Sequence, residues 1–505
     1  MRGRCQGPAK GDHLNLLDLF AIPLARDPEK RALADLSYRD LLAQADSLAA
    51  GLYAKGLRKG DRVAFFLGNR PEFVTVYLAV ISLGAVMVPI NLAYRRREIA
   101  HMLGDAAPRF LLTETAQLPI LEELEPEERR SIERVILAEE IAKWHGDPAV
   151  RSIVRVDGSD LAMILYTSGT TGRSKGAMIS HDNVLATVTS LLAAWSWRSD
   201  DVLLLALPLF HTHGLVVGLH CALAAGATVL LRRRFEAAEV ARELLEGEPT
   251  LFFGVPTMYV RLVEELGKVE DRSGLARMRL FCSGSAPLAP ETFAAFRDLT
   301  GHSILERYGM TETGMNLSNP YVGERRPGTV GTPLPGVSAW IVDGDGKEIE
   351  SGREGELLVR GSNVFAGYWQ APEKTAESFL HDELGRRWFK TGDLARQDPE
   401  TGYFTLLGRR HELIISGGFN IYPREIEEVI ASFPGVREVA VAGRSHPEWG
   451  EVPVAWLVTD GEIDDAALAA FCKEQMASFK VPREVRRVEA LPRNALGKVQ
   501  KHLLG

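Results

Sequence analysis

The chain has 505 residues with a formal net charge of −8, and 46% of its residues are hydrophobic. A chain of this length exceeds what one hydrophobic core supports, so we expect more than one domain. The acidic balance argues against a nucleic-acid-binding protein, whose surface is usually basic. The cysteines lie far apart without paired spacing, which indicates reduced thiols in the cytoplasm and not a disulfide framework (Cys5, Cys221, Cys282 and Cys472).

Two segments resemble targeting or membrane signals at first sight. Residues 1–12 are basic but have no apolar core, so they predict a disordered extension and not a secretory signal, while an organelle-targeting role stays open. Residues 202–231 are long and apolar enough to span a bilayer. Pro208, His211 and Gly226 interrupt this run, which favours a strand, a loop and a helix within a large core and no membrane span.

Strand-like and helix-like segments alternate through most of the chain. Residues 61–67 predict a strand, residues 72–83 predict a helix after a turn, and residues 85–90 predict another strand. This alternation predicts an α/β fold with largely parallel sheets flanked by helices. Further strands are expected at residues 161–165, 202–207, 228–231, 251–254 and 279–282.

The pattern changes near residue 337 to short strands separated by turn signals, which predicts a β-rich subdomain over about residues 337–408. We place a domain boundary at residue 409. The large domain then covers residues 13–408, and a small, mobile α+β domain covers residues 409–505. Within these parts we expect strands at residues 354–360, 436–443 and 453–458 and a helix at residues 423–432.

The most informative motif is the loop Tyr166–Gly176, which follows a strand-like segment. Its glycines allow close backbone approach, its hydroxyl groups are hydrogen-bond donors, and Lys175 supplies a positive charge. This composition predicts a cradle for phosphate oxygens, although a flexible linker would have a similar composition. The Gly-Lys-Ser/Thr order of the nucleotide P-loop does not occur in it. The candidate phosphate-binding residues are Thr167, Ser168, Gly169, Thr170, Thr171, Gly172 and Lys175.

Further motifs follow this loop along the chain, in the order Gly284–Pro287, Glu306–Glu312, Thr391–Asp393, Gly408-Arg409, Gly417-Gly418 and Gly497-Lys498. The ordered set resembles the adenylate-forming enzymes, and within them the acyl-CoA synthetases, over nearly the whole chain. The resemblance implies a reaction with ATP, Mg²⁺ and CoA. A carboxylate would attack the α-phosphate of ATP to give an acyl-adenylate and pyrophosphate, and the CoA thiol would then displace AMP.

The resemblance also assigns roles at the nucleotide site. Tyr308 would stack on the adenine, and Thr311 would contact the α-phosphate. Glu312 would hold Mg²⁺ together with Thr170, because carboxylate and hydroxyl oxygens suit this ion. Asp393 would accept hydrogen bonds from the ribose hydroxyls, with a solvated turn aspartate as the alternative. The remaining candidates are Arg409, which would assist Asp393, and Gly284, Ser285, Ala286, Pro287, Glu306, Arg307, Gly309 and Met310, with a surface ion pair between Glu306 and Arg307 as the alternative.

Lys498 is the residue that we expect to catalyse adenylation. An ammonium beside the attacked phosphorus stabilises charge on its oxygens, whereas an exposed C-terminal lysine such as Lys501 is normally inert. The resemblance implies that the small domain rotates between the half-reactions about a hinge. The hinge position is His411 in this chain, where relatives usually have Asp or Lys. Gly417 and Gly418 would leave room for the pantetheine arm of CoA.

Two histidines lie close together in the segment Leu207–Gly214. On a strand, His211 and His213 would face the same way and could suggest a zinc site. A catalytic zinc usually has three protein ligands, and His220 and Cys221 lie on an apolar helix, so we do not expect this metal. The resemblance places His211 instead at the acid-binding site, as a catalytic and substrate-binding residue.

Substrate choice depends on Arg261, which follows an almost wholly apolar segment. Relatives that activate malonate carry an arginine in the matching place, since a second carboxylate needs a charged partner in such a pocket. The alternative is an i,i+4 pair with Glu265 on the surface of a helix. Ser283 and Met310 would contribute to the same acid-binding site.

The segments Glu306–Tyr321 and Gly323–Gly331 are most similar to those of malonyl-CoA synthetases. We therefore expect ATP-dependent ligation of malonate, or of methylmalonate, to CoA. Three alternatives stay open: a short- or medium-chain monocarboxylate ligase, an adenylation enzyme that loads a carrier protein, and a non-catalytic nucleotide-binding relative. The expected partners are small molecules, and the residues that bind the CoA nucleotide and the oligomeric state are left open.

Overall fold

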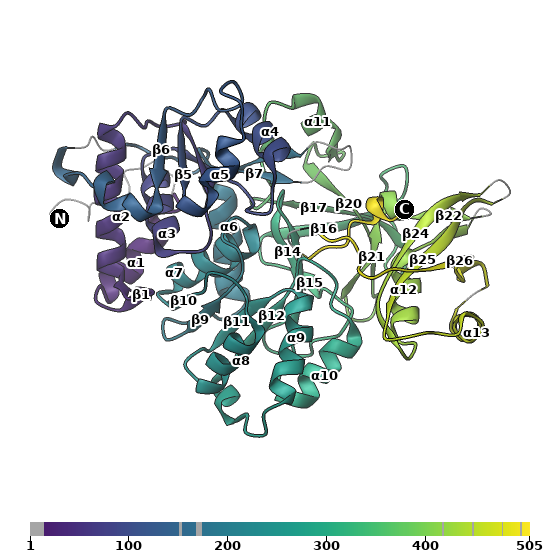
Figure 1. The fold of residues 1–505 in the computed structure, drawn as a ribbon. Helices are drawn as coiled ribbons and strands as arrows, with labels where there is room; N and C mark the ends of the chain where they lie inside the picture. Colours follow the sequence, from purple (N-terminus) through teal and green to yellow (C-terminus); the bar gives the residue numbers. More distant parts are fainter. Residues whose placement is uncertain are drawn as a thin grey trace.

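The computed structural model describes residues 15–150, 154–167, 174–416, 419–446, 449–476, 478–494 and 497–505. Two large sheets with helices form the body of the molecule, and two smaller sheets follow toward the C-terminus (Figure 1). This arrangement confirms the expected α/β fold. The predicted extension at residues 1–12 lies outside the described residues.

The first large sheet has the strand order β18-β8-β7-β4-β3-β5-β6. Five neighbouring strands run parallel, namely β7, β4, β3, β5 and β6. At one edge, β8 pairs antiparallel with β7, and β18 pairs antiparallel with β8. Most residues of β3, β4 and β5 are buried, as expected when helices cover both faces of a parallel sheet. The strands cover Arg62–Phe66 (β3), Val86–Pro89 (β4), Phe110–Thr113 (β5), Arg134–Leu137 (β6), Leu161–Thr167 (β7), Lys175–Ser180 (β8) and Gly367–Tyr368 (β18).

The second large sheet has the order β15-β14-β13-β12-β11-β9-β10-β1-β2. The strands from β13 to β1 run parallel, and both edges end in antiparallel pairs. The strands cover Arg31–Leu33 (β1), Leu36–Ser37 (β2), Val202–Leu205 (β9), Thr228–Leu231 (β10), Leu251–Gly254 (β11), Leu280–Ser283 (β12), Leu305–Met310 (β13), Gly314–Ser318 (β14) and Thr332–Pro333 (β15).

Helices separate and cover the two large sheets. The apolar α3 is buried almost all round and belongs to the main core, which also holds side chains from α2, α6, β7 and β11. On the outer side of the second sheet, α8, α9 and α10 lie together at the bottom of Figure 1. The helices cover Asp18–Arg26 (α1), Tyr38–Ala54 (α2), Pro71–Ser82 (α3), Arg96–Ala106 (α4), Leu118–Glu122 (α5), His181–Ala194 (α6), Cys221–Ala225 (α7), Ala237–Glu246 (α8), Pro256–Gly267 (α9), Pro290–Thr300 (α10) and Pro372–Glu377 (α11).

Two antiparallel-rich sheets complete the chain. The third sheet, β16-β17-β20-β19 with β21 beside β20, covers Val337–Val342 (β16), Glu354–Gly361 (β17), Phe379–His381 (β19), Arg387–Gln397 (β20) and Phe404–Arg409 (β21). The fourth sheet, β23-β22-β25-β24 with β26 beside β25, covers Ile414–Ser416 (β22), Phe419–Ile421 (β23), Val436–His446 (β24), Gly450–Thr459 (β25) and Glu484–Arg487 (β26). The helices α12 (Pro423–Ala431) and α13 (Asp465–Gln475) pack on the fourth sheet.

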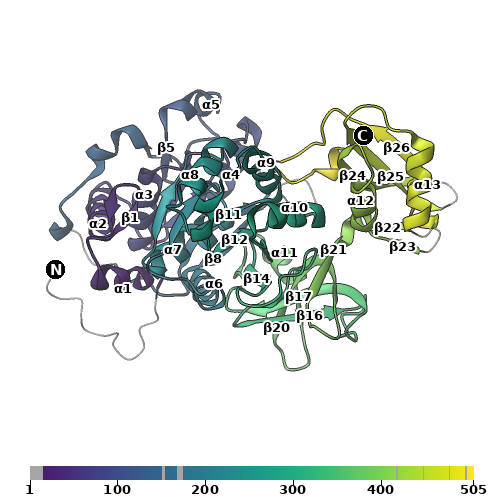
Figure 2. The ribbon, with the colours of Figure 1, turned by 90° about the horizontal axis from the view of Figure 1, so that it is seen from below.

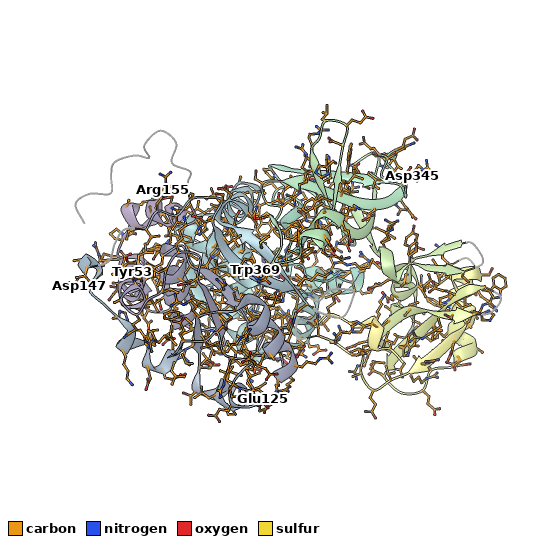
Figure 3. The ribbon with its side chains drawn as sticks, turned by 90° about the horizontal axis from the view of Figure 1, so that it is seen from above. Tyr53, Glu125, Asp147, Arg155, Asp345 and Trp369 are labelled. Atoms are coloured by element: carbon orange, nitrogen blue, oxygen red, sulfur yellow. The ribbon has the colours of Figure 1, made fainter. Side chains whose placement is uncertain are left out.

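The fourth sheet and its helices stand apart from the body, as Figure 2 shows from below. The division at residue 409 stays a prediction, and it falls at the end of β21, just before the fourth sheet begins. Figure 3 shows that side chains fill the space between the layers of the body, and Trp369 lies within this body. Asp345 lies at the outer end of the third sheet in the same view.

The apolar segment at residues 202–231 folds as β9, a π-helix at His213–His220 (η4), α7 and β10. The expected strand, loop and helix are confirmed there. Among the helices of the described residues, none is long and apolar enough to cross a membrane.

Candidate active site

A buried carboxylate lies where β20 meets β21. Asp393 is paired in register with Arg409, whose Nε lies 2.9 Å from Asp393 Oδ1. The hydroxyl of Tyr308 donates to the other carboxylate oxygen at 2.5 Å. Burial, and then the Asp393 carboxylate, raise the pKa of Tyr308 well above its usual value. Because a carboxylate can accept about four hydrogen bonds, Asp393 can keep these partners and still accept from ribose hydroxyls.

A second buried carboxylate, Glu312, lies between strand β7 and Tyr368. It accepts hydrogen bonds from the hydroxyls of Tyr368, at 3.0 Å, and Thr167, at 3.3 Å. Burial raises the pKa of Glu312, so its charged form is stabilised by a cation placed beside it. A carboxylate oxygen next to a threonine hydroxyl fits the oxygen ligands that Mg²⁺ prefers. Thr170, the other expected ligand, lies outside the described residues.

The two ends of the expected phosphate loop are held by α4. His101 Nε2 lies 2.9 Å from the carbonyl oxygen of Ser174, and its ring packs edge-on against Tyr166. The Tyr166 hydroxyl donates to Asp105 at 2.5 Å. Lys175 begins β8 and lies over the Tyr368 ring, 5.6 Å from its centre. Sequence reasoning missed His101 and Asp105, because α4 precedes the loop by more than sixty residues. The other expected loop residues, Ser168, Gly169, Thr170, Thr171 and Gly172, lie outside the described residues.

Two glycines of the motifs are required by close packing. A Cβ on Gly284 would lie 2.4 Å from Arg307 Nη1, and a Cβ on Gly309 would lie 2.1 Å from the carbonyl oxygen of Gly314. Gly284 directly follows β12, as expected, and leads into the turn that carries Ser285, Ala286 and Pro287. A side chain at either position would collide with backbone or with a buried guanidinium. The two motifs therefore have glycine at these positions because no room is left for a side chain.

A cavity of about 220 Å³ opens beside this turn. His211 and His213 both line it, and His213 Nδ1 lies 3.3 Å from the Ser285 hydroxyl. Burial lowers the pKa of His211 to about 4 and lowers the pKa of His213 well below its usual value, so both rings are neutral at pH 7. The remaining lining residues are Leu207, Pro208, Gly214, Phe235, Val255, Thr257, Met258, Arg261 and Gly497.

His211 and His213 do not lie on a strand, which was the arrangement considered for a zinc site. His211 lies in a bend after β9, and His213 begins the π-helix η4. Their rings still share one cavity, because the bend brings them to the same wall. A second, much smaller cavity on the other side of His211 is lined by Tyr166, Thr212 and Thr311, so His211 separates the larger cavity from the end of β7.

Arg261 lies on α9 and reaches the larger cavity. The alternative pair with Glu265 does not form, because Glu265 pairs with Lys268 at 2.8 Å. Among the residues that the structure describes, no hydrogen bond or ion pair is found for Arg261. Arg261 is an exposed residue at the cavity, and its role as an acid-binding arginine stays a prediction.

Glu306 and Arg307 do not form the surface ion pair that was the alternative for them, because both are buried on β13. Arg307 Nε and Nη2 have no hydrogen-bond partner among the described residues. Burial lowers the pKa of Arg307, yet arginine starts so high that it stays charged at neutral pH. Glu306 accepts from the Leu288 amide at 3.2 Å, and burial raises its pKa to about 7.

Other unpartnered polar atoms lie close to Arg307. His213 Nε2 and Ser283 Oγ are buried without a partner among the described residues, and the charge of Arg307 helps to lower the pKa of His213. Ser283 does not line the cavity, which is reached by Ser285 two residues later. Met310 ends β13, one residue before Thr311, and its sulfur lies 3.8 Å from the Tyr308 hydroxyl.

The C-terminal segment brings Lys498 to this site. Gly497 lines the cavity, and the yellow segment that carries it reaches toward α9 in Figure 2. Lys498 remains solvent-accessible, while protein packed around its amine and the charge of Arg409 lower its pKa, and Glu412 and Asp393 oppose this. The charges of the predicted ribose-binding pair, Asp393 and Arg409, thus act on the predicted catalytic lysine.

The expected hinge, His411, lies in the short 3₁₀-helix Arg410–Glu412 (η6), of which the backbone is described. Arg410 Nη1 lies 2.5 Å from Glu356 on β17. Gly417 and Gly418 lie outside the described residues, so the pantetheine passage stays a prediction.

In the described part of the chain, no group of three or more His, Cys, Asp or Glu side chains is arranged to hold a metal ion. His220 is buried and stacks on Tyr77, and the thiol of Cys221 lies 3.6 Å from the carbonyl oxygen of Val216. Neither side chain lines either cavity.

Comparison with known protein families agrees with the motifs that form the site. Residues 20–369 match the model of the AMP-binding enzyme family, and residues 425–498 match the model of the AMP-binding enzyme C-terminal domain. The chain belongs to the AMP-binding enzyme family. It is an adenylate-forming CoA ligase, and such enzymes use ATP, Mg²⁺ and CoA, as the sequence motifs implied.

Individual relatives of this ligase act on several acids. The mitochondrial malonate–CoA ligase of Bos taurus is 34% identical, covering 98% of this chain and 88% of the relative. A 2-succinylbenzoate–CoA ligase of Bacillus licheniformis is 36% identical, covering 93% and 94%. The crystal structure of ATP-bound MatB from Rhodopseudomonas palustris superposes with a TM-score of 0.88 at 40% identity, covering 97% of this chain and 98% of that one.

Proposed function

We propose that this ligase joins malonate, or the similar methylmalonate, to CoA through an acyl-adenylate. The observation that carries the proposal is the pair of arginines at the acid-binding cavity. Arg261 lines the cavity, and Arg307 lies beside Gly284, next to the cavity-lining Ser285. Arg307 is buried with two unpartnered nitrogens, whereas Arg261 is exposed at the cavity and has no hydrogen bond or ion pair among the described residues. A buried, incompletely paired cation costs several kcal/mol, and the second carboxylate of a small diacid would relieve that cost.

The reacting carboxylate would then point away from these arginines, toward Thr311 and Lys498. Thr311 lines the small cavity on the far side of His211, where the α-phosphate of ATP would lie by resemblance. Lys498 would stabilise the charge that gathers on the phosphate oxygens during attack. His211, neutral at pH 7, would separate the acid from the phosphates without adding charge.

The other groups would hold ATP in place. Asp393 would bind the ribose hydroxyls, and Tyr308 would pack against the adenine, with both side chains fixed by their mutual hydrogen bond. Glu312 and Thr167 would hold Mg²⁺, which supplies charge neutralisation on the phosphate oxygens. The CoA thiol would attack the acyl-adenylate after the small domain has rotated about His411.

The second candidate is a ligase for a monocarboxylate. Its support is the apolar part of the cavity wall, where Phe235, Val255 and Met258 could pack against an alkyl chain. The relative from Bacillus licheniformis shows that the family resemblance alone does not select malonate. Arg307 argues against this candidate, since an alkyl chain would leave its buried charge incompletely paired.

The experiment is a substrate panel with Arg261→Leu. Pyrophosphate release is measured with malonate, methylmalonate, acetate and octanoate, with and without CoA. Malonate should give the highest kcat/KM, and Arg261→Leu should lower that value by about 30-fold while acetate turnover stays unchanged, because one charge-assisted contact is lost. The control is Arg277→Leu, an exposed arginine away from the cavity. Equal turnover of monocarboxylates, or full malonate activity in Arg261→Leu, would refute the proposal.

The cellular compartment stays a prediction. The scattered cysteines favour the cytoplasm, and the described ones, Cys221, Cys282 and Cys472, are all free and buried. The relative from Bos taurus is named as mitochondrial, so the relatives do not decide between the two compartments.

A further inference from the structure

The segment that carries Lys498 folds back on itself. The Asn494 amide donates to the Lys498 carbonyl oxygen at 2.8 Å, and the Gly497 amide donates to the Asn494 carbonyl oxygen at 2.9 Å. Arg493 and Val499 form an isolated antiparallel bridge at the base of this turn. Lys498 therefore lies in a closed turn, directly after Gly497.

Gly497 brings this turn to the larger cavity. A Cβ on Gly497 would lie 3.6 Å from Thr257 Oγ1 on α9, and both residues line the cavity. Gly497 has a φ of +76°, a left-handed conformation that residues with a side chain rarely adopt. The direction in which the Lys498 side chain leaves the turn therefore depends on the peptide group that joins Gly497 to Lys498.

Both polar atoms of this peptide group are held by side chains of the same turn. Arg493 Nη1 donates to the Gly497 carbonyl oxygen at 2.5 Å, and the Lys498 amide donates to Asn494 Oδ1 at 3.0 Å. Because a peptide group is planar, these two bonds fix the orientation of the plane that ends at the Cα atom of Lys498. Arg493 therefore holds the backbone from which the Lys498 side chain extends.

Arg493 is itself tied to the fourth sheet. Its Nη2 lies 2.9 Å from Glu438 Oε2 on β24, and a planar guanidinium can serve a carboxylate and a carbonyl oxygen at once. At the far end of the segment, Lys501 is not the exposed lysine that the sequence suggested, because its side chain is 16% exposed and pairs with Glu427 of α12 at 2.7 Å. Arg493 differs from Lys501 in that it reaches the residue directly before Lys498.

We propose that Arg493 is a positioning residue for Lys498: it ties the peptide group between Gly497 and Lys498 to Glu438, and so directs the Lys498 ammonium toward the α-phosphate. This inference rests on the proposed function, in which Lys498 serves the adenylation step. It concerns that half-reaction alone, since thioester formation would take place after the small domain has moved.

The test uses the full chain with the acid that it turns over fastest. Arg493→Met should lower the rate of pyrophosphate formation about 10-fold, because a shift of about 1 Å in a catalytic group can cost about 100-fold and a smaller shift costs less. Thioester formation from supplied acyl-adenylate should stay within about 2-fold of the wild type, since a half-exposed ion pair adds little to the stability of the small domain. Equal loss of both half-reactions would show a structural role and overturn the proposal.

Glu438→Gln tests whether Arg493 acts from a fixed position. In this variant Arg493 keeps its bond to Gly497 but loses its charged partner, so pyrophosphate formation should fall about 3-fold. The double variant of Arg493→Met with Glu438→Gln should equal Arg493→Met alone within about 2-fold, because the two residues form one unit. Multiplied losses in the double variant would overturn the proposal, and so would an unchanged Glu438→Gln, since Arg493 would then act without this anchor.

Arg437→Met is the matched control. Arg437 directly precedes Glu438 on β24 and pairs with Asp460 at 3.6 Å. This variant should retain pyrophosphate formation. A loss equal to that of Arg493→Met would overturn the proposal, because any weakened ion pair of β24 would then have the same effect.

Lys498→Ala separates this inference from the proposed function. Adding Arg493→Met to Lys498→Ala should lower pyrophosphate formation no further, and a further loss would overturn the proposal, since Arg493 would then act without Lys498. If Lys498→Ala lacks pyrophosphate formation while Arg493→Met behaves as wild type, only the positioning role fails. If Lys498→Ala keeps pyrophosphate formation, the proposed role of Lys498 fails, and the positioning role fails with it.

Discussion

The charged side chains of the candidate active site are paired differently in two regions. We call the region of Asp393, Arg409, Tyr308 and Glu312 the nucleotide side, and the region of Arg261 and Arg307 the acid side. On the nucleotide side, Asp393 is already paired with Arg409 and Tyr308, and Glu312 accepts two hydroxyl hydrogen bonds. On the acid side, Arg307 is buried with two unpartnered nitrogens. On the proposed function, the protein stabilises the groups that would bind ATP with its own side chains, while it leaves Arg307, which would face the acid, incompletely paired.

This difference has a physical meaning for specificity. A group that is satisfied before binding holds its geometry but gains little from one ligand over another. A buried cation without a full set of partners gains strongly from an anion and loses from an alkyl group. On the proposed function, the nucleotide side would therefore set position, and the acid side would select the substrate.

The largest effect is expected from Lys498→Ala, which removes the ammonium proposed to act between the acid and the α-phosphate. Pyrophosphate release should fall by roughly 100- to 1,000-fold, since a preorganised charge at the developing oxyanion is lost. Thioester formation from supplied acyl-adenylate should be largely retained. The control is Lys473→Ala, an exposed lysine on α13. Equal loss in both half-reactions would mean that Lys498 does not act in adenylation.

Arg307→Met should weaken the use of the acid substrate selectively and leave ATP binding intact. We expect kcat/KM for malonate to fall by about 30-fold, while the KM for ATP changes by less than about 3-fold. The melting temperature should stay constant or rise, because a buried and incompletely paired charge is replaced by an apolar side chain of similar length. Steady-state kinetics and thermal unfolding measure both. A raised KM for ATP together with a lower melting temperature would assign Arg307 to the nucleotide side.

Asp393→Asn should act on the nucleotide side with a smaller effect, about 10-fold in kcat/KM for ATP, because the amide still accepts a hydrogen bond. The KM for the acid should not change. Thermal stability should fall, since Arg409 loses the charge that partners it. Asp398→Asn, in an exposed turn with Thr401, is the control. A change in acid preference would contradict the separation of the two sides.

Most of the fold could be predicted from the sequence, because the strands of the two large sheets are apolar runs separated by helices. The strand at residues 251–254 has the predicted bounds, and the helix at Pro71–Ser82 differs by one residue at each end. The bend at His211 was not predictable in this way. Its conformation depends on the π-helix that follows and on Gly214, where a Cβ would lie 2.3 Å from the carbonyl oxygen of Pro208.

Site residues that belong to sequence motifs could be predicted. Residues that are brought to the site by contacts between distant segments could not. Asp393 and Arg409 were expected together, and they are paired across β20 and β21. The contact of His101 with Ser174 and the ion pair of Lys501 with Glu427 join segments that are distant in the chain, for which the sequence carries no local pattern. The resemblance assigned Arg307 to the nucleotide site, and its assignment to the acid side is a proposal that rests on its buried, unpartnered nitrogens.

A buried histidine pair tests whether unpartnered polar atoms always mark a binding site. His220 stacks on Tyr77, and both of its ring nitrogens lack a partner among the described residues, although it lines neither cavity. His181 Nδ1 accepts from the Leu16 amide at 3.3 Å, which requires that nitrogen to be unprotonated. Burial lowers the pKa of His220 to about 3, with His181 contributing, and it lowers the pKa of His181 to about 4 against the opposing charge of Asp160.

These histidines should therefore control acid stability and not catalysis. Below the usual histidine pKa of about 6.5 the unfolded chain binds protons that the folded chain does not, so stability is complete above pH 6.5 and is lost as the pH falls toward 4. From pH 7 to 5, His220 alone should contribute a loss of about 2 kcal/mol. His220→Phe, which keeps the stacked ring, should flatten the fall of the melting temperature over this range and leave malonate turnover at pH 7.5 unchanged. An unchanged pH profile of the melting temperature would show that His220 already titrates as an exposed histidine does, while lost turnover would show that this unpartnered pair belongs to the active site after all.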